Sequence, residues 1–132
     1  TNVMCKLCDK DPESHSFYKL ASEGDASIIY SCPGDAKATD KESVIAHITE
    51  VLEAQKGKKW IWIVDGKGFG VKQAARVKTS TAIMNLITST YNDTLLEIRM
   101  VNPTKYVVGV FKTIVPFMHP SLKNKIVWKH KS

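Results

Sequence analysis

The stretch Trp60–Val64, WIWIV, is apolar at every position and is followed at once by Asp65 and Gly66. A strand with one solvated face alternates apolar and polar residues, whereas a strand covered on both faces reads as a continuous apolar run. Its β-branched and aromatic residues favour a strand over a helical segment of the same length. The stretch therefore predicts a strand of a parallel sheet that is covered on both faces.

Strand-like and helix-like patterns alternate along the rest of the chain. Two β-prone runs, 17–21 and 27–32, are separated by Ser-Glu-Gly-Asp, which predicts a hairpin. Further strands are expected at Leu95–Val101 and Lys125–Trp128, and helices after the capping-box pattern Thr39–Glu42, over Lys72–Tyr91 and over Lys105–Val115. The alternation predicts one α/β domain over residues 1–132, a three-layer sandwich with a mainly parallel central sheet flanked by helices. Residues 1–14 are polar and are expected to form an N-terminal tail.

The loop Asp65–Gly70, DGKGFG, joins the apolar strand to a helix, a context in which a helix N-terminus can bind phosphate. Its spacing fits neither G-x-G-x-x-G nor G-x-x-x-x-G-K-[ST]. Position 85, about twenty residues on, is Asn rather than the acid that would hold a ribose. The loop therefore favours a structural crossover, in which Asp65 caps backbone groups at the strand end, over a nucleotide site.

Residues that carry catalysis or bind metals are sparse. Cys5 and Cys8 form one CxxC motif, Cys32 stands apart, and His15 is the only histidine near them. A zinc site needs four ligands at regular spacing, and a redox dithiol is expected between a strand and a helix. No histidine is spaced with a Ser or Cys as a nucleophile motif requires. The sequence predicts no metal, no cofactor and no enzyme activity, and the odd cysteine count favours a reducing compartment.

The net charge of +6 is unevenly distributed. Residues 1–54 hold five Lys and ten acidic residues, whereas residues 55–132 hold fourteen Lys or Arg and three acidic residues. The basic half favours an anionic membrane or an acidic protein as partner, although lysines also serve solubility. Nucleic acid is not expected, because only two of the nineteen basic residues are Arg. With a polar N-terminus and no apolar run of about 20 residues, the chain is expected to be cytoplasmic, with peripheral membrane contact at most.

Residues 105–118, KYVVGVFKTIVPFM, are apolar almost all the way around a helix. The non-apolar positions that form one narrow stripe are Lys105, Gly109, Lys112 and Pro116. A helix that packs on a sheet needs an apolar arc of only about 100°, and this segment is too short to cross a bilayer. Either another layer of the protein covers its outer side, or that side meets lipid or a partner.

Four strings occur in a characteristic order: IWIVDGKGFG, TYND, LLEIRMVNPTKYVVGVFKTIVPFM and LKNKIVW. With them the chain resembles the CRAL-TRIO lipid-binding family, whose members have a strand ending in Asp and a glycine loop, an Asn-x-Pro after the next strand and a helix closing in Lys-Pro-Phe. The fourteen-residue step from Asn102 to Pro116 fits that pattern without a gap. Asn-Pro-Thr at 102–104 is closer to the divergent branch that includes the BCH scaffold domains. The N-terminal helical lobe common in the family has no counterpart in this sequence.

The resemblance implies a small lipid-binding module that holds a phospholipid or another hydrophobic molecule between the sheet and the apolar helix 105–118. The side chains of that helix expected to contact the ligand are Tyr106, Val110, Phe111, Ile114 and Phe117. Asp93 and Lys125 match the residues that hold an inositol phosphate in phosphatidylinositol-binding members.

Two surfaces of the same helix lead to two expectations. Lys105 and Lys112 on its polar stripe, with Lys123 beside the last strand, are expected to face an anionic membrane. The BCH-like alternative is a protein-interaction scaffold, in which the apolar arc binds a partner helix or a second copy of the chain.

Overall fold

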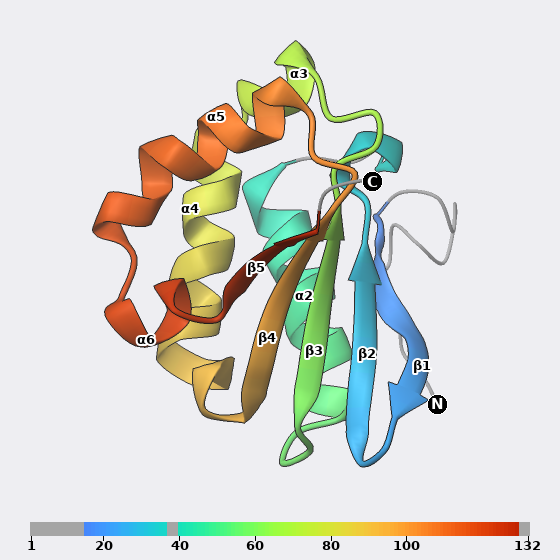
Figure 1. The fold of residues 1–132 in the computed structure, drawn as a ribbon. Coiled ribbons are helices and arrows are strands. Elements are labelled where there is room, and N and C mark those ends of the chain that lie inside the picture. Colours follow the sequence, from blue (N-terminus) through green and yellow to red (C-terminus); the bar gives the residue numbers. More distant parts are fainter. Residues whose placement is uncertain (1–14, 37–39, 130–132) are drawn as a thin grey trace.

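The structure, a computed structural model, describes residues 15–36 and 40–129 (Figure 1). The strands are β1 (Phe17–Glu23), β2 (Ala26–Ser31), β3 (Trp60–Asp65), β4 (Leu95–Val101) and β5 (Ile126–Lys129). The helices are α2 (Lys41–Ala54), α3 (Val71–Ala74), α4 (Val77–Leu86), α5 (Lys105–Ile114) and α6 (Pro120–Lys123), with a π-helical turn at Ile87–Tyr91 and short 3₁₀ turns elsewhere. The polar tail predicted for residues 1–14 lies outside the described residues.

The strands form one sheet in the order β1-β2-β3-β4-β5. β1 and β2 make the predicted hairpin, whose turn contains Gly24 at φ +61°, a conformation that glycine adopts without strain. The pairs β2–β3, β3–β4 and β4–β5 are all parallel. The prediction of an α/β fold with a mainly parallel sheet flanked by helices is therefore confirmed.

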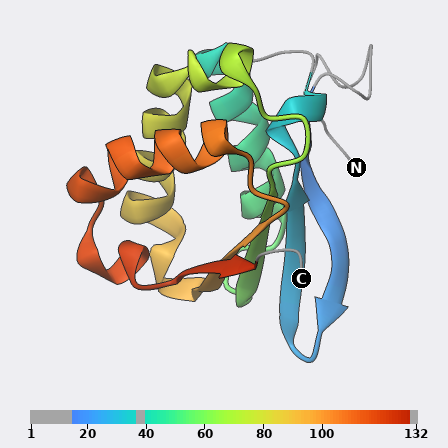
Figure 2. The ribbon, with the colours of Figure 1, turned by 45° about the horizontal axis from the view of Figure 1, so that its top comes forward.

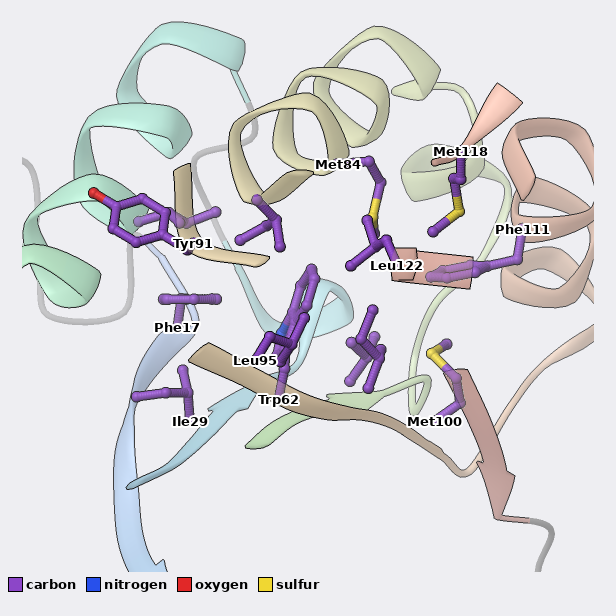
Figure 3. Close-up of a cluster of buried hydrophobic side chains, with 14 of the residues drawn as sticks. Phe17, Ile29, Trp62, Met84, Tyr91, Leu95, Met100, Phe111, Met118 and Leu122 are labelled. Atoms are coloured by element: carbon purple, nitrogen blue, oxygen red, sulfur yellow. The ribbon is translucent and has the colours of Figure 1, made fainter. Parts of the chain in front are cut away.

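The hydrophobic core lies on one face of this sheet. Ile29, Trp62 and Ile98 are paired across β2, β3 and β4, and all three are buried in the same cluster as side chains from the helices. Because the strands follow one another in chain order and parallel crossovers are right-handed, the connecting helices pass over the same face. Figures 1 and 2 show α2, α4 and α5 gathered on one side, and Figure 3 shows Met84, Phe111 and Leu122 above the strand residues.

The opposite face of β3 carries Ile61 and Ile63, which alternate with the core residues of that strand. Ile61 is only 5% exposed, but it is not part of the core cluster that the described strands and helices form. The all-apolar strand predicts cover on both faces, whereas the described helices lie on one. Strand order decides this difference, and strand order is not visible in a local sequence pattern.

Two helix boundaries differ from the sequence prediction. Asp40 caps α2, because its side chain accepts the Ser43 N–H at 3.0 Å, whereas the sequence pattern indicated Thr39, which lies outside the described residues. The helix predicted over Lys72–Tyr91 is interrupted at Arg76, whose φ of −92° and ψ of 48° are not helical. No glycine or proline marks that interruption, so residue propensity does not reveal it.

Candidate ligand-binding cavity

The start of α5 is fixed above the ends of β3 and β4. Asn102 takes a φ of 49°, the left-handed conformation that Asn tolerates better than most residues, and ends β4. Thr104 caps the helix: its Oγ1 accepts the Val107 N–H at 3.3 Å and donates to the Phe69 carbonyl at 2.8 Å. The helix ends at the 3₁₀ turn Val115–Phe117, which contains a proline. These contacts determine which side of α5 faces the sheet.

Beneath α5 lies an apolar cavity of about 120 Å³. It is bounded by the core face of β2 and β3, by α2, α4 and the inner side of α5. The α5 side chains that line it, all between 1% and 6% exposed, are Val107, Val110, Phe111 and Ile114. Trp62 from β3, Ile48 from α2 and Met84 from α4 complete most of the apolar lining.

The volume restricts what this conformation can hold. A cavity of about 120 Å³ is close to the roughly 150 Å³ that accommodates one benzene ring. Ligand pockets for larger molecules typically occupy about 300–1,000 Å³. A diacyl phospholipid therefore requires the helix above the cavity to move, whereas a compact apolar group fits beneath it in place.

Two surface grooves flank the same helix. One, of about 490 Å³, runs along the outer side of α5 between Val108, Val115 and Trp128, with the Phe111 and Trp128 rings edge to face at 5.8 Å. The other, of about 360 Å³, lies between α4 and the turn at Phe117. Helix α5 thus has an apolar cavity on its inner side and grooves along its outer surface.

The polar residues of the cavity lining include two groups. His15 and His47, with ring centroids 4.8 Å apart, form the first group. The second group spans the turn from α3 to α4 and consists of Gln73, Arg76, Thr79 and Ser80. Burial, and then the neighbouring His47, lower the pKa of His15, against a smaller opposing effect of Asp40.

His15 also contacts a serine and, through it, a carboxylate. Ser43 Oγ lies 3.1 Å from His15 Nε2 and donates to Asp40 Oδ1 at 2.6 Å. In a Ser-His-Asp triad the imidazole stands between the hydroxyl and the carboxylate. Here the hydroxyl stands between the other two groups, and its proton is directed to the carboxylate. This geometry stabilises the start of α2 and does not activate a nucleophile.

The structure brings three of the five predicted α5 contact residues to the cavity. Val110, Phe111 and Ile114 line it, whereas Tyr106 and Phe117 do not. Phe117 is 89% exposed and borders the groove against α4. Ligand contact by all five residues stays a prediction. Val110, Phe111 and Ile114 lie where that prediction requires them.

Asp93 and Lys125 lie together at the other end of the sheet, before β4 and β5. Lys125 Nζ donates to the carbonyl oxygen of Asn92 at 2.6 Å and to its Oδ1 at 2.8 Å. Burial lowers the pKa of Lys125, and Asp93 partly opposes this effect. Neither residue lines the cavity beneath α5. A headgroup bound by this pair would therefore lie away from the polar residues of the cavity.

The three lysines predicted to face a membrane, Lys105, Lys112 and Lys123, are all exposed. Lys105 Nζ lies 5.2 Å from the centroid of the Tyr106 ring, and Lys112 borders the outer groove of α5. Exposure is compatible with membrane contact, which stays a prediction.

The glycine loop has the structural role that the sequence favours. Asp65 Oδ1 accepts the Lys67 N–H at 2.9 Å and the Asn102 side-chain amide at 3.2 Å. Tyr30 donates to Asp65 Oδ2 at 2.6 Å. The carboxylate is thus occupied by groups of the protein, and its predicted capping of the backbone is confirmed.

The sequence analysis missed His15, His47 and Arg76 as cavity residues. They come from the approach to β1, from α2 and from the break between α3 and α4. No spacing rule connects positions so far apart, and the break at Arg76 was itself not predicted. Only the packing of the helices on the sheet brings them to one cavity.

Metal ligands do not cluster in the described part of the chain, where no group of three or more His, Cys, Asp or Glu could hold an ion. Cys5 and Cys8 lie outside the described residues, and Cys32 is a buried free thiol. No helix within residues 15–36 and 40–129 is long and apolar enough to cross a bilayer.

A five-stranded sheet with helices over one face and an apolar cavity beneath the last long helix defines an α/β protein built to hold a hydrophobic group. The sequence profile of the CRAL/TRIO domain matches residues 33–132, so the chain belongs to that family. Domains of this family bind lipids or other small hydrophobic molecules.

The fold is also similar to a solved structure, the crystal structure of Sfh5, with a TM-score of 0.69 and 13% sequence identity. The similarity covers 97% of this chain and 51% of Sfh5, so the chain spans about half the length of that protein. At this identity the comparison concerns the fold. No curated protein sequence matches the chain.

Proposed function

We propose that the chain is a binding module for a hydrophobic ligand, which it holds between the sheet and α5 without a catalytic step. The observation that supports this most directly is the apolar cavity beneath α5, most of whose lining side chains lie within the family-matched residues 33–132. An unfilled apolar cavity costs stability, because its lining atoms lack partners. Occupation by an apolar group restores those contacts.

A phospholipid is the larger of the two ligand classes that the proposal includes. It requires α5 to swing away from the core, because about 120 Å³ is far less than a diacyl lipid needs. The grooves on both sides of α5 leave space for such a movement. A small hydrophobic molecule requires no movement.

The test incubates the purified protein with a mixed lipid extract and identifies the co-purifying molecules by mass spectrometry. Val110→Phe places a larger side chain in the cavity, and Val108→Phe makes the same change two residues earlier, at the outer groove. We expect recovery of a hydrophobic molecule from the wild type and from Val108→Phe, and none from Val110→Phe. No molecule above background from several extracts, or equal recovery from all three proteins, would count against the cavity as the binding site.

Contact with anionic membranes is the second part of the proposal. It rests on the basic half of the chain and on three exposed lysines on or next to α5 and α6. Each lysine near an anionic surface contributes about 1 kcal/mol, so a few such contacts give weak and reversible association.

A protein-interaction scaffold is the second candidate function, and Phe117 is the observation that favours it. A phenyl ring that is 89% exposed beside the groove between α4 and the end of α5 is a natural anchor for a partner or a second copy. Solution mass by light scattering tests this: a stable dimer without bound lipid, converted to monomer by Phe117→Ser, would favour the scaffold. A monomer at all concentrations would remove self-association from consideration.

A further inference from the structure

We propose that the ligand of the cavity beneath α5 is an amphiphile with an anionic head, such as a carboxylate, which Arg76 binds at the cavity edge with the help of Gln73 and Ser80. The inference rests on the proposed binding function and names the chemical class of the ligand. It also places the head at the turn between α3 and α4, away from Lys125.

The charged residues of the cavity are of one sign. Arg76 lines it together with the imidazoles of His15 and His47, and no Asp or Glu is among the described lining residues. Arg76 is exposed and makes no ion pair within residues 15–36 and 40–129. A guanidinium at the edge of an apolar cavity without a carboxylate partner favours a ligand that supplies one.

The neutral polar groups beside Arg76 also offer donors. Gln73 Oε1 already accepts the Gly70 N–H at 2.9 Å. The Gln73 amide N–H₂ donates to no described residue and is therefore available to a ligand. Ser80 Oγ likewise has no hydrogen-bond partner in the described part of the chain. The Arg76 guanidinium, the Gln73 amide and the Ser80 hydroxyl can all donate, and three donors from the end of α3 to the start of α4 match the oxygens of a carboxylate.

The cavity volume sets the size of the apolar part. About 120 Å³ accommodates roughly the atoms of a small ring or a short alkyl chain. A medium-chain or aromatic carboxylate can therefore place its apolar end beneath α5 and its head at Arg76 without displacing the helix. Longer chains reach the same head position only if α5 moves.

The test uses three probes with the same alkyl chain: octanoate, 1-octanol and octylamine. Titration calorimetry measures the affinities below micellar concentrations, and the fluorescence of Trp62, which lines the cavity, gives a second readout. We expect octanoate to bind about tenfold more tightly than octanol, since hydrogen bonds to charged groups are roughly twice as strong as neutral ones, and octylamine to bind least.

Variants at two neighbouring basic positions locate the head. Arg76→Gln should lower the affinity for octanoate about tenfold and leave that for octanol unchanged, whereas Lys78→Gln, at an exposed position outside the lining, should change neither. Arg76→Lys keeps the charge but lacks the planar guanidinium. Its affinity for octanoate should lie between those of wild type and Arg76→Gln. Thermal unfolding of each variant checks that the fold is intact.

The outcomes separate this inference from the proposed function. Equal binding of octanoate and octanol, or a preference that survives in Arg76→Gln, overturns the anionic head and leaves the cavity as a binding site. Failure of all three probes to bind overturns both the anionic head and the cavity as a site for small hydrophobic molecules, whereas the lipid-extract experiment decides separately on a phospholipid.

Discussion

The phenol of Tyr30 donates a 2.6 Å hydrogen bond to Asp65, which joins the carboxyl end of β2 to that of β3. Asn102 donates to the other oxygen of the same carboxylate from the end of β4. Asp65 therefore holds three strand ends together at the edge where α5 begins. Burial opposes the ionisation of Asp65, but its hydrogen bonds, first that from Tyr30, together lower its pKa below the ordinary value.

Replacement of Asp65 by Asn should destabilise the protein by about 1–3 kcal/mol, because an amide nitrogen in place of Oδ2 cannot accept from Tyr30 and leaves this half-buried hydroxyl without its acceptor. Chemical denaturation measures the free energy of unfolding. Asp25→Asn, at an exposed position of the hairpin turn, is the matched control and should stay within about 0.5 kcal/mol of wild type. An Asp65→Asn protein as stable as the control would contradict the role assigned to this carboxylate.

The same carboxylate predicts a dependence of stability on acid. Because its pKa is lower in the folded state, its contribution is complete above the unfolded value of 3.8 and is lost as pH falls through the folded pKa. The free energy of unfolding of wild type should therefore fall more steeply than that of Asp65→Asn as the pH drops below the unfolded value of 3.8. Parallel profiles for the two proteins would exclude Asp65 as the source.

Two glycines near α5 should respond to alanine in opposite directions. A Cβ at Gly109, exposed within α5, would meet no atom within 4 Å, so Gly109→Ala should stabilise the protein by about 0.5–1 kcal/mol through the helix propensity of Ala. A Cβ at Gly66 would lie 2.7 Å from the Asn102 carbonyl oxygen, so Gly66→Ala should destabilise by about 1–3 kcal/mol. Thermal unfolding of the two variants compares them directly. If both substitutions raised or both lowered the melting temperature, the close approach of Gly66 to the Asn102 carbonyl oxygen would be contradicted.

The basic surface of α5 and α6 should bind anionic vesicles at low salt. Reversal of Lys105, Lys112 and Lys123 to Glu should abolish co-sedimentation with such vesicles and leave the melting temperature nearly unchanged, because all three are exposed. Wild-type binding should weaken as salt shortens the Debye length from about 10 Å at 0.1 M.

A second triple variant controls for net charge. Lys19, Lys58 and Lys59 are exposed on β1 and in the loop before β3, and their reversal to Glu changes the charge by the same amount. Equal loss of binding in both triple variants would mean that total charge, rather than the surface of α5, determines association.

Lys125 is either a headgroup ligand or a structural contact between the start of β5 and Asn92. If it binds an inositol phosphate together with Asp93, Lys125→Gln should weaken binding to phosphatidylinositol phosphate vesicles more than to phosphatidylserine vesicles of equal charge. Lys129→Gln, at an exposed position of β5, should weaken both equally and slightly. A lower melting temperature for Lys125→Gln with no change in lipid selectivity would leave only the structural role.

The sequence by itself determined the elements whose causes are local. The continuous apolar run of β3 and the apolar surface of α5 arise from side-chain patterns that act within a few residues, and the capping-box pattern before α2 is equally local. The capping role of Asp65 is likewise a matter of a short polar side chain at a strand end. The CRAL-TRIO resemblance added the order of these elements, and the family match confirmed it.

Tertiary structure alone decided the features that depend on distant segments. The gathering of helices on one face follows from strand order, and the break at Arg76 has no local signal. The cavity exists because α2, α4 and α5 leave about 120 Å³ unfilled when they pack on β2 and β3. His15, His47 and Arg76 meet at that cavity only through this packing, since a periodicity rule carries no information about which surfaces come together in the folded chain.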